Sequence, residues 1–213
     1  MDTNSIFWFR RDLRLNDNTA LYYALKTEEV PILPVFIFDK EILSQIESQK
    51  DRRVEFIYNQ LQFLKKQLEA HSSSMLILNG NPIDQFKFLL EKYNISGLYF
   101  NRDYEPYAIQ RDQEVTELFN ENGIPVNSFK DQVIFEKNDI LKKDRKPYTV
   151  FTPYKRKWQE AFQTISIKPY QTEPLFNNFI HVKPFSTPTL EKIGFQKTDY
   201  TYPAPKLDEE IIK

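Results

Sequence analysis

Short apolar runs that alternate with helical patterns constrain the fold of this chain more than any other feature of its sequence. The runs span residues 5–9, 32–38, 75–78 and 98–100, and a fifth strand is expected at 126–129. Such runs are typical of strands buried on both faces, as in a parallel sheet covered by helices. Their order predicts an α/β fold over roughly residues 1–130, with a five-stranded, doubly wound parallel sheet of Rossmann-like type and right-handed crossovers.

The helices between these strands have apolar stripes and recognisable ends. In residues 51–70 the spacings of three and four form one stripe, made by Val54, Ile57, Leu61, Leu64 and Leu68. Asn81 with Pro82, and Pro106 further on, are typical of helix starts. Gly123 is typical of a helix end. A shorter helix is expected over about residues 18–26.

The chain changes character after residue 130. Residues 131–164 form a basic closing segment, in which 152–163 predict a short helix with Trp158 and Phe162 on one face. Residues 165–213 hold six of the thirteen prolines and no sustained periodicity, which predicts an extended linker. We expect this linker to add little to the core, so that residues 1–165 unfold cooperatively. A long linker at the end suggests a fragment of a longer protein.

Composition excludes several kinds of chemistry. The absence of Cys excludes disulfides, thiolate metal sites and Cys nucleophiles. The two His residues, His71 and His181, are too far apart in sequence to suggest a multi-His metal site. No apolar run approaches the ~20 residues that span a bilayer, and no secretory signal is recognisable. The net charge of −1 gives no global basic field. We expect a cytoplasmic protein with no membrane partner, and a monomer.

The loop after the first strand contains no Gly, although phosphate-binding loops need Gly for close backbone approach. Ordinary dinucleotide and P-loop sites are therefore not predicted, and an adenine-nucleotide domain of the universal-stress type is disfavoured. The loop instead packs three Arg and two Asp into residues 10–17, at a sheet edge where ligands bind in open α/β folds. Asp12, Arg14 and Asp17 are interpreted mainly as an internal salt-bridge cluster. Arg11 is the stronger ligand candidate.

Two further groups follow strands and should open onto the same edge: Asp39, and the run from Asn101 to Pro106. Glu105 also suits a helix start, whereas Asp103 is not needed there. Arg53 lies where a helix dipole favours acids, which indicates a specific partner. That partner is either Asp39 or a ligand anion, and the sequence leaves both open.

The opening residues 8–18, WFRRDLRLNDN, resemble the first motif of the DNA photolyase and cryptochrome family. Further matches follow in order at residues 36–39, 53–57, 80–82, 101–106 and 111–112, then at 147–154 with Trp158, and at 187–195. The resemblance covers nearly the whole chain and identifies it as the family's N-terminal α/β domain plus linker. It implies that this domain binds a light-harvesting antenna chromophore. It also implies that FAD and damaged DNA bind a helical domain beyond Lys213, so that no catalytic residue lies in this chain.

The resemblance suggests a photolyase, with a cryptochrome-type blue-light receptor as the alternative. It also implies the antenna type. The folate-binding class has Asn and Glu where this chain has Tyr107 and Ala108, and Ala offers no polar group. A flavin or deazaflavin is therefore favoured over a folate. The expected cofactor-binding residues are Arg11, Phe36, Asp39, Arg53, Asn101, Asp103 and Glu105. The rival is an empty pocket held by an Arg53–Asp39 salt bridge.

Two basic runs, at residues 142–146 and 155–157, suggest that this part of the chain could bind nucleic acid directly. Such runs are more often solvated surface, and binding through them would depend strongly on salt.

Overall fold

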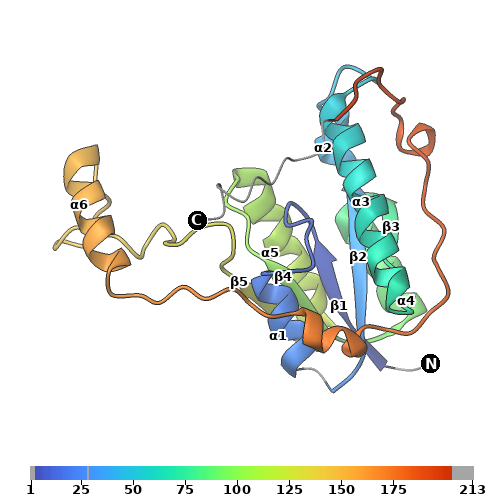
Figure 1. Cartoon of the computed structure of the whole chain (residues 1–213), viewed down its shortest axis with the longest axis horizontal. Coiled ribbons are helices and arrows are strands. Elements are labelled where there is room, and N and C mark those ends of the chain that lie inside the picture. Colours follow the sequence, from blue (N-terminus) through green and yellow to red (C-terminus); the bar gives the residue numbers. More distant parts are fainter. Residues whose placement is uncertain (1–2, 28, 203–213) are drawn as a thin grey trace, which may run out of the picture.

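The computed structural model describes residues 3–27 and 29–202. It contains one five-stranded sheet in the order β3-β2-β1-β4-β5, and every neighbouring pair is parallel. The strands are β1 (Thr3–Phe9), β2 (Ile32–Asp39), β3 (Leu76–Gly80), β4 (Asn94–Asn101) and β5 (Val126–Phe129). The predicted α/β fold class is confirmed, and the central β1 lies at the point where the strand order reverses (Figure 1).

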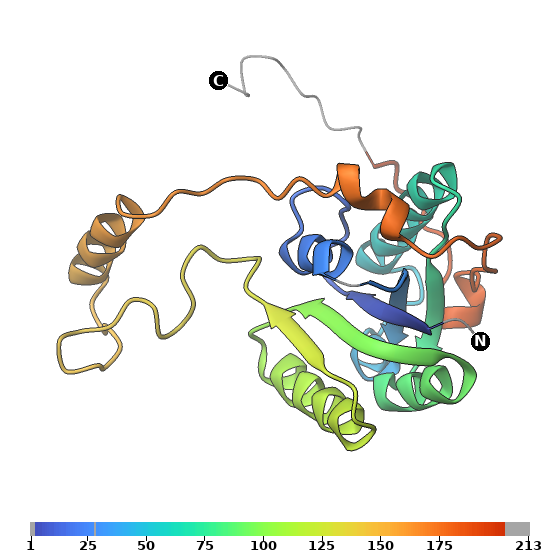
Figure 2. The same ribbon diagram turned by 90° about the horizontal axis from the view of Figure 1, so that it is seen from below.

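Two helical layers cover the sheet (Figure 2). One face packs against α1 (Thr19–Thr27) and α3 (Arg52–Ala70), with Phe7 and Phe9 of β1 pointing into that layer. The opposite face packs against α4 (Pro82–Lys92) and α5 (Pro106–Glu121), and receives Ile6 and Trp8. This alternation follows from the two-residue period of a strand, and it makes β1 buried on both sides.

Local chemistry defines most helix ends as predicted. The Asn81 side chain accepts the N–H of Ile83 at the start of α4, with Pro82 at the first helical position. Gly123 has φ +71° just after α5, in the left-handed region that favours Gly. The sequence analysis missed α2 (Lys40–Ser44), a five-residue helix that follows β2 directly and is too short to show a period.

The segment after β5 leaves the domain and returns. Helix α6 (Phe151–Phe162) stands apart from the sheet in both views (Figures 1 and 2). The chain then runs back along the α1 and α3 side of the domain, with two short 3-10 helices, η1 (Glu173–Asn178) and η2 (Glu191–Ile193). The short helix expected at 152–163 is thus confirmed to within a residue.

The returning segment contributes directly to the core. Its buried apolar side chains join the cluster that contains α1 and α3, and they are Phe176, Phe179, Leu190, Ile193 and Phe195. The N–H of Ile180 also donates to the carbonyl of Ile32 at 2.9 Å, beside the start of β2. The expectation that this segment adds little to the core is therefore wrong. Its apolar residues insert singly, at irregular spacing, so they left no periodic signal in the sequence.

Candidate functional site

A cavity of about 340 Å³ lies where the carboxyl ends of β1 and β2 face the start of α5. Five of the seven expected site residues line it: Arg11, Phe36, Asp39, Asp103 and Glu105. Helices α2 and α3 close the other side. Ligands of open α/β sheets bind at this carboxyl edge, because the loops after parallel strands gather there. A larger hollow of about 570 Å³ beside α5 and β5 holds only Asp103 of the seven, so the candidate residues converge on the smaller cavity.

Asp39 organises the polar wall of the cavity. Its carboxylate is buried, and one oxygen accepts the N–H of Glu41, which caps α2. The other oxygen accepts the hydroxyl of Tyr107 at 2.8 Å and lies 3.5 Å from Nη1 of Arg111. Burial, followed by the bond to Asp39, raises the pKa of Tyr107, so its hydroxyl stays protonated and donates.

Arg11 lies at the rim of the cavity rather than in its depth. Its Nη1 is 2.8 Å from Glu105 Oε1 and 3.5 Å from Asp103 Oδ1. The side chain is 59% exposed, so these pairs orient it without removing it from water. The rim thus presents a cation held by two carboxylates that themselves line the cavity.

Apolar side chains form the facing wall: Phe36 from β2, Ile42 and Leu43 from α2, and Val54 and Ile57 from α3. The ring of Phe36 meets Phe38 edge-on, with centroids 5.0 Å apart. This contact restricts the rotation of the Phe36 ring. A cavity with one apolar wall and one polar wall suits a flat ring system with a polar edge.

Trp8 lines the cavity beside two guanidinium groups. Arg10 and Arg111 each lie 4.9 Å from the Trp8 ring centroid, a distance at which cations are attracted to the ring. Arg10 pairs with Asp112, which Arg111 also contacts. The Trp8 indole N–H has no hydrogen-bond partner among the described residues, although Trp8 is 2% exposed.

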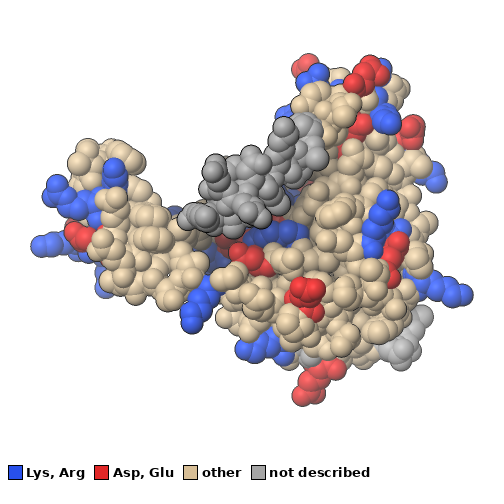
Figure 3. Space-filling model, in the orientation of Figure 1, with Lys and Arg blue, Asp and Glu red and all other residues tan. Residues whose placement is uncertain are grey.

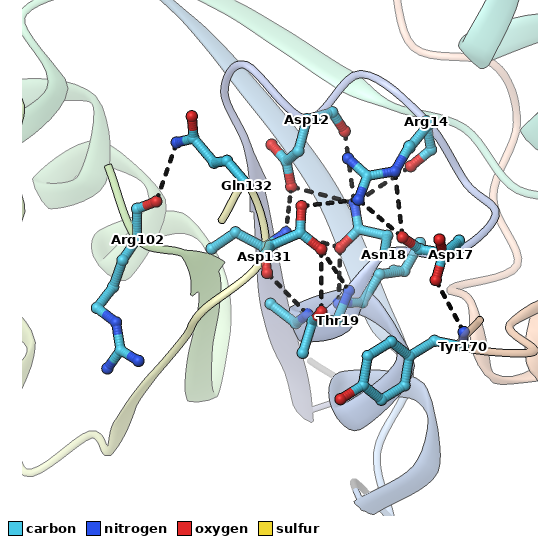
Figure 4. Close-up of polar contacts among 12 residues, drawn as sticks. Asp12, Arg14, Asp17, Asn18, Thr19, Arg102, Asp131, Gln132 and Tyr170 are labelled. Carbon is cyan, nitrogen blue, oxygen red and sulfur yellow. Dashed lines mark hydrogen bonds and ion pairs between the residues drawn. The ribbon is translucent and has the colours of Figure 1, made fainter. Parts of the chain in front are cut away.

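Asn101 does not belong to the cavity, contrary to the expectation from sequence. Its side chain is buried against α1 (Figure 4 draws the surrounding loop), where Oδ1 accepts the N–H of Ala20 at 2.9 Å. Its Nδ2 donates to Asp12 and to Asn18. Asn101 therefore joins β4 to the β1–α1 loop.

The start of α1 is closed by the protein's own side chains. Its first three N–H groups donate to Asp131, Asn101 and Asn18 respectively. An ordinary dinucleotide would place its phosphates at this helix end. The absence of a Gly-rich loop and the occupied N–H groups at the start of α1 therefore both argue against an ordinary dinucleotide site there.

The loop cluster of Asp12, Arg14 and Asp17 is internal, as interpreted, but its partners differ from those expected (Figure 4). Arg14 donates to the carbonyl of Asp17 and pairs with Asp131 at 2.7 Å. Asp12 accepts from Asn18 and from the N–H of Arg10 instead of forming an ion pair.

Arg53 also lies outside the cavity. Its Nη2 is 2.7 Å from Asp51 Oδ2, and its side chain is 76% exposed. Asp51 additionally accepts the N–H groups of Arg53 and Val54, so it both caps α3 and holds the guanidinium. The suggested Arg53–Asp39 salt bridge is wrong, because Asp39 faces Tyr107 and Arg111 instead.

Three important residues of the cavity were not among the expected site residues: Tyr107, Arg111 and Trp8. Arg111 follows Tyr107 by four residues, so both lie on one face of α5, and this spacing was the available signal. Within residues 3–27 and 29–202, no cluster of three or more His, Asp or Glu side chains could hold a metal ion. No helix in the same residues is long and apolar enough to span a membrane.

Comparison with known proteins agrees with this architecture. The family model of DNA photolyase matches residues 5–174. A deoxyribodipyrimidine photo-lyase of Synechococcus is 28% identical over 89% of this chain and 40% of its own length. Cryptochrome-2 of Arabidopsis thaliana is 34% identical over 74% of this chain and 25% of its own length.

A solved structure is similar as well. The archaeal photolyase from Sulfolobus tokodaii, with two FAD molecules and the implication of a novel light-harvesting cofactor, is 29% identical with a TM-score of 0.64. The match covers 79% of this chain and 37% of that one. The chain therefore spans less than half the length of each of these three relatives.

Proposed function

The chain belongs to the DNA photolyase family, and we propose that it is the domain that holds the antenna chromophore of a DNA photolyase. When bound, the chromophore would absorb light and pass the excitation to FAD. The observation that carries this proposal is the cavity at the carboxyl edge of the sheet, with Phe36 on one wall and Asp39, Tyr107 and Arg111 on the other. These side chains would bind and orient a flat ring and exclude water from one of its faces.

The size of the cavity limits what it accepts. Ligand pockets commonly measure roughly 300–1,000 Å³, and 340 Å³ lies near the lower limit. The cavity therefore suits a single ring system, while a phosphorylated or ribityl tail would extend past the rim at Arg11. Because α1 is closed by Asp131, Asn101 and Asn18, its start offers no competing phosphate site.

We infer a flavin or deazaflavin rather than a folate. Ala108 lines the cavity without a polar group, and the hydroxyl of Tyr107 is already donated to Asp39. Tyr107 and Ala108 therefore offer a pterin no free side-chain donor. The S. tokodaii photolyase with two FAD molecules supports a flavin-type ligand in this family.

The remaining functions of the whole protein are proposals from its relatives. Repair of pyrimidine dimers would use FAD and damaged DNA, which we propose are bound by a further, helical domain. Within this chain we propose an α/β domain at 1–130, a closing segment at 131–164 and an interdomain linker at 165–213, whose part from Phe176 to Phe195 packs into the core of that domain. A cytoplasmic monomer remains our expectation. The Arabidopsis cryptochrome match favours a blue-light receptor as the second candidate.

Binding by Trp8 fluorescence tests the proposal. The chain has two Trp residues, so Trp158→Phe leaves Trp8 as the only indole reporter, in the cavity wall. This variant is titrated separately with FMN, a deazaflavin and methenyl-folate. We expect saturable, one-to-one quenching by a flavin-type ligand and none by the folate. Tight folate binding without flavin binding would reject the chromophore choice, and no binding of any of the three would reject the antenna role.

A further inference from the structure

One wall of the cavity belongs to an exposed stretch of chain, residues 40–50, which we call the α2 segment. No residue of α2 itself is buried, and in the whole segment only Leu43 and Ile46 are partly buried. Figure 3 shows basic and acidic side chains mixed around this end of the domain, as expected of a solvated surface. A helix of five residues is not stable by itself in water, so contacts with the rest of the chain hold α2 in place.

The start of the α2 segment is fixed to the cavity. Asp39 caps α2 by accepting the N–H of Glu41, and the same carboxylate accepts the hydroxyl of Tyr107 in the cavity wall. Three side chains of the segment then line the cavity: Ile42, Leu43 and Gln45. Displacement of the α2 segment would therefore open one side of the cavity.

A strap from the returning segment supports the α2 segment. We give this name to residues 190–198, which include η2. Leu43 and Ile46 pack against the core cluster that contains Ile193 and Phe195 of the strap. All four side chains also line one hollow between α2 and η2. The two side chains of the α2 segment that are shielded from water are thus the ones beside the strap.

Hydrogen bonds fix the strap at its C-terminal side. The N–H of Gln196 donates to the carbonyl of Gln49 at 2.8 Å, which joins the strap to the end of the α2 segment. Thr198 donates its N–H and its hydroxyl to Glu55, a buried carboxylate near the start of α3. A buried carboxylate needs such donors, and within the described residues Glu55 has no ion pair. The strap is therefore anchored to α3 as well as to the α2 segment.

We propose that the α2 segment is a lid through which a chromophore enters and leaves the cavity, and that the strap holds this lid closed. The proposal rests on the proposed function of the cavity. Regions with few buried apolar contacts open at a lower free energy than the rest of a fold, and the lids of binding sites come from such regions. The other walls include buried core residues, among them Trp8, Phe36 and Val54.

A strap that holds a lid affects the rates of binding more than the affinity. In the described part of the chain no strap residue lines the cavity, so the strap makes the same contacts whether the cavity is empty or occupied. Weakening these contacts raises the open fraction of both states by the same factor. The association and dissociation rates therefore rise together, whereas loss of a group that touches the ligand changes mainly the dissociation rate.

Thiol labelling of the ligand-free chain measures the opening of the lid. The chain contains no Cys, so Val54→Cys introduces the only thiol, in the cavity wall at a position that is 2% exposed. In this background Phe195→Ala is compared with Phe179→Ala, with 4,4′-dithiodipyridine as the reagent. Both Phe side chains are buried in the same core cluster. Phe179 lies beside Ile32 at the start of β2, whereas α2 follows the other end of that strand.

We expect Phe195→Ala to raise the labelling rate by roughly tenfold or more, and Phe179→Ala to raise it by less than about threefold. Stopped-flow quenching of Trp8 by FMN, in the Trp158→Phe background, measures the binding rates. Phe195→Ala should raise both rate constants by roughly tenfold and leave the affinity within about threefold. The milder pair Phe195→Leu and Phe179→Leu gives the same comparison if an alanine variant does not fold.

Equal labelling rates in the two variants would show that the thiol is exposed by global unfolding, and would overturn the lid. Unchanged labelling in Phe195→Ala, or a rise in the dissociation rate alone, would overturn it as well. Absence of FMN binding by the parent chain would instead overturn the proposed function. The labelling comparison needs no ligand, so it would still decide whether the strap holds the α2 segment closed.

Discussion

Tyr107 donates its hydroxyl to Asp39 at 2.8 Å, which ties the first turn of α5 to the end of β2 across the wall of the cavity. Tyr107→Phe removes this donor and leaves a buried carboxylate oxygen with Arg111 as its nearest cation. We expect a loss of about 1–2 kcal/mol of folding free energy, because an unsatisfied buried acceptor is costly. Thermal unfolding should shift down by roughly 2–8 °C. Tyr58→Phe, on α3, is the control and should leave the melting temperature unchanged. Equal decreases for the two variants would show that the Tyr107–Asp39 hydrogen bond does not stabilise the fold.

The hydroxyl of Tyr104 should make the free energy of unfolding depend on pH in the alkaline range. Tyr104 donates to Glu136 at 2.8 Å, and burial, followed by that bond, raises its pKa from 10.0 to about 12. Because the folded chain holds this proton more tightly, its stabilising effect is complete below pH 10 and is lost as pH rises to about 12. Urea unfolding of the wild type and Tyr104→Phe should show a stability difference that shrinks across this window. A difference independent of pH would contradict the assignment.

The sheet could be predicted because runs buried on both faces leave an unmistakable apolar signal. The carboxyl-edge rule indicated that Arg11, Asp39, Asp103 and Glu105 lie at one edge of the sheet, the family resemblance added Phe36, and all five line one cavity. That rule says which end of a strand a residue occupies and not which way its side chain points.

Asn101 and Arg53 illustrate what the rule omits. Asn101 shares the face of Tyr99, two residues earlier on β4, and that face packs on α1. Side chains alternate between the two faces of a strand, so the sequence alone already predicts that Asn101 faces α1 with Tyr99. Arg53 was assigned from the helix dipole alone, whereas its partner Asp51 lies two residues away as the cap of α3. The aromatic residues of the returning segment had no periodic signal, so their burial required the tertiary structure.

Asn101→Ala separates a structural role from a binding role. The substitution leaves the N–H of Ala20 without its acceptor and removes one of the donors to the buried carboxylate of Asp12, which keeps Asn18 and the N–H of Arg10. We expect a loss of about 3 kcal/mol and a melting temperature lower by roughly 6–12 °C. Flavin affinity, measured well below the melting temperature, should stay unchanged, as should both properties in the exposed control Asn138→Ala. A specific loss of flavin binding would return Asn101 to the site.

Phe179 tests whether the returning segment belongs to the core. Its ring is fully buried beside Phe176. Phe179→Ala should cost about 3–5 kcal/mol, as for other large-to-small core substitutions. Phe162→Ala, in the exposed part of α6, should cost little. If chemical unfolding shows comparable losses of unfolding free energy for the two variants, the returning segment does not belong to the core. The expectation from sequence, a linker outside the core, would then be correct.

The most direct test of the account is the flavin affinity of two arginine variants, measured side by side by Trp8 quenching in the Trp158→Phe background. Arg11 lines the cavity, whereas Arg53 pairs with Asp51 in solvent outside it. A charge-assisted hydrogen bond contributes about 1.5–3 kcal/mol, so Arg11→Ala should weaken flavin binding by roughly tenfold or more. Arg53→Ala should leave the affinity within about twofold. The reverse order, or equal losses, would contradict a chromophore seated in this cavity.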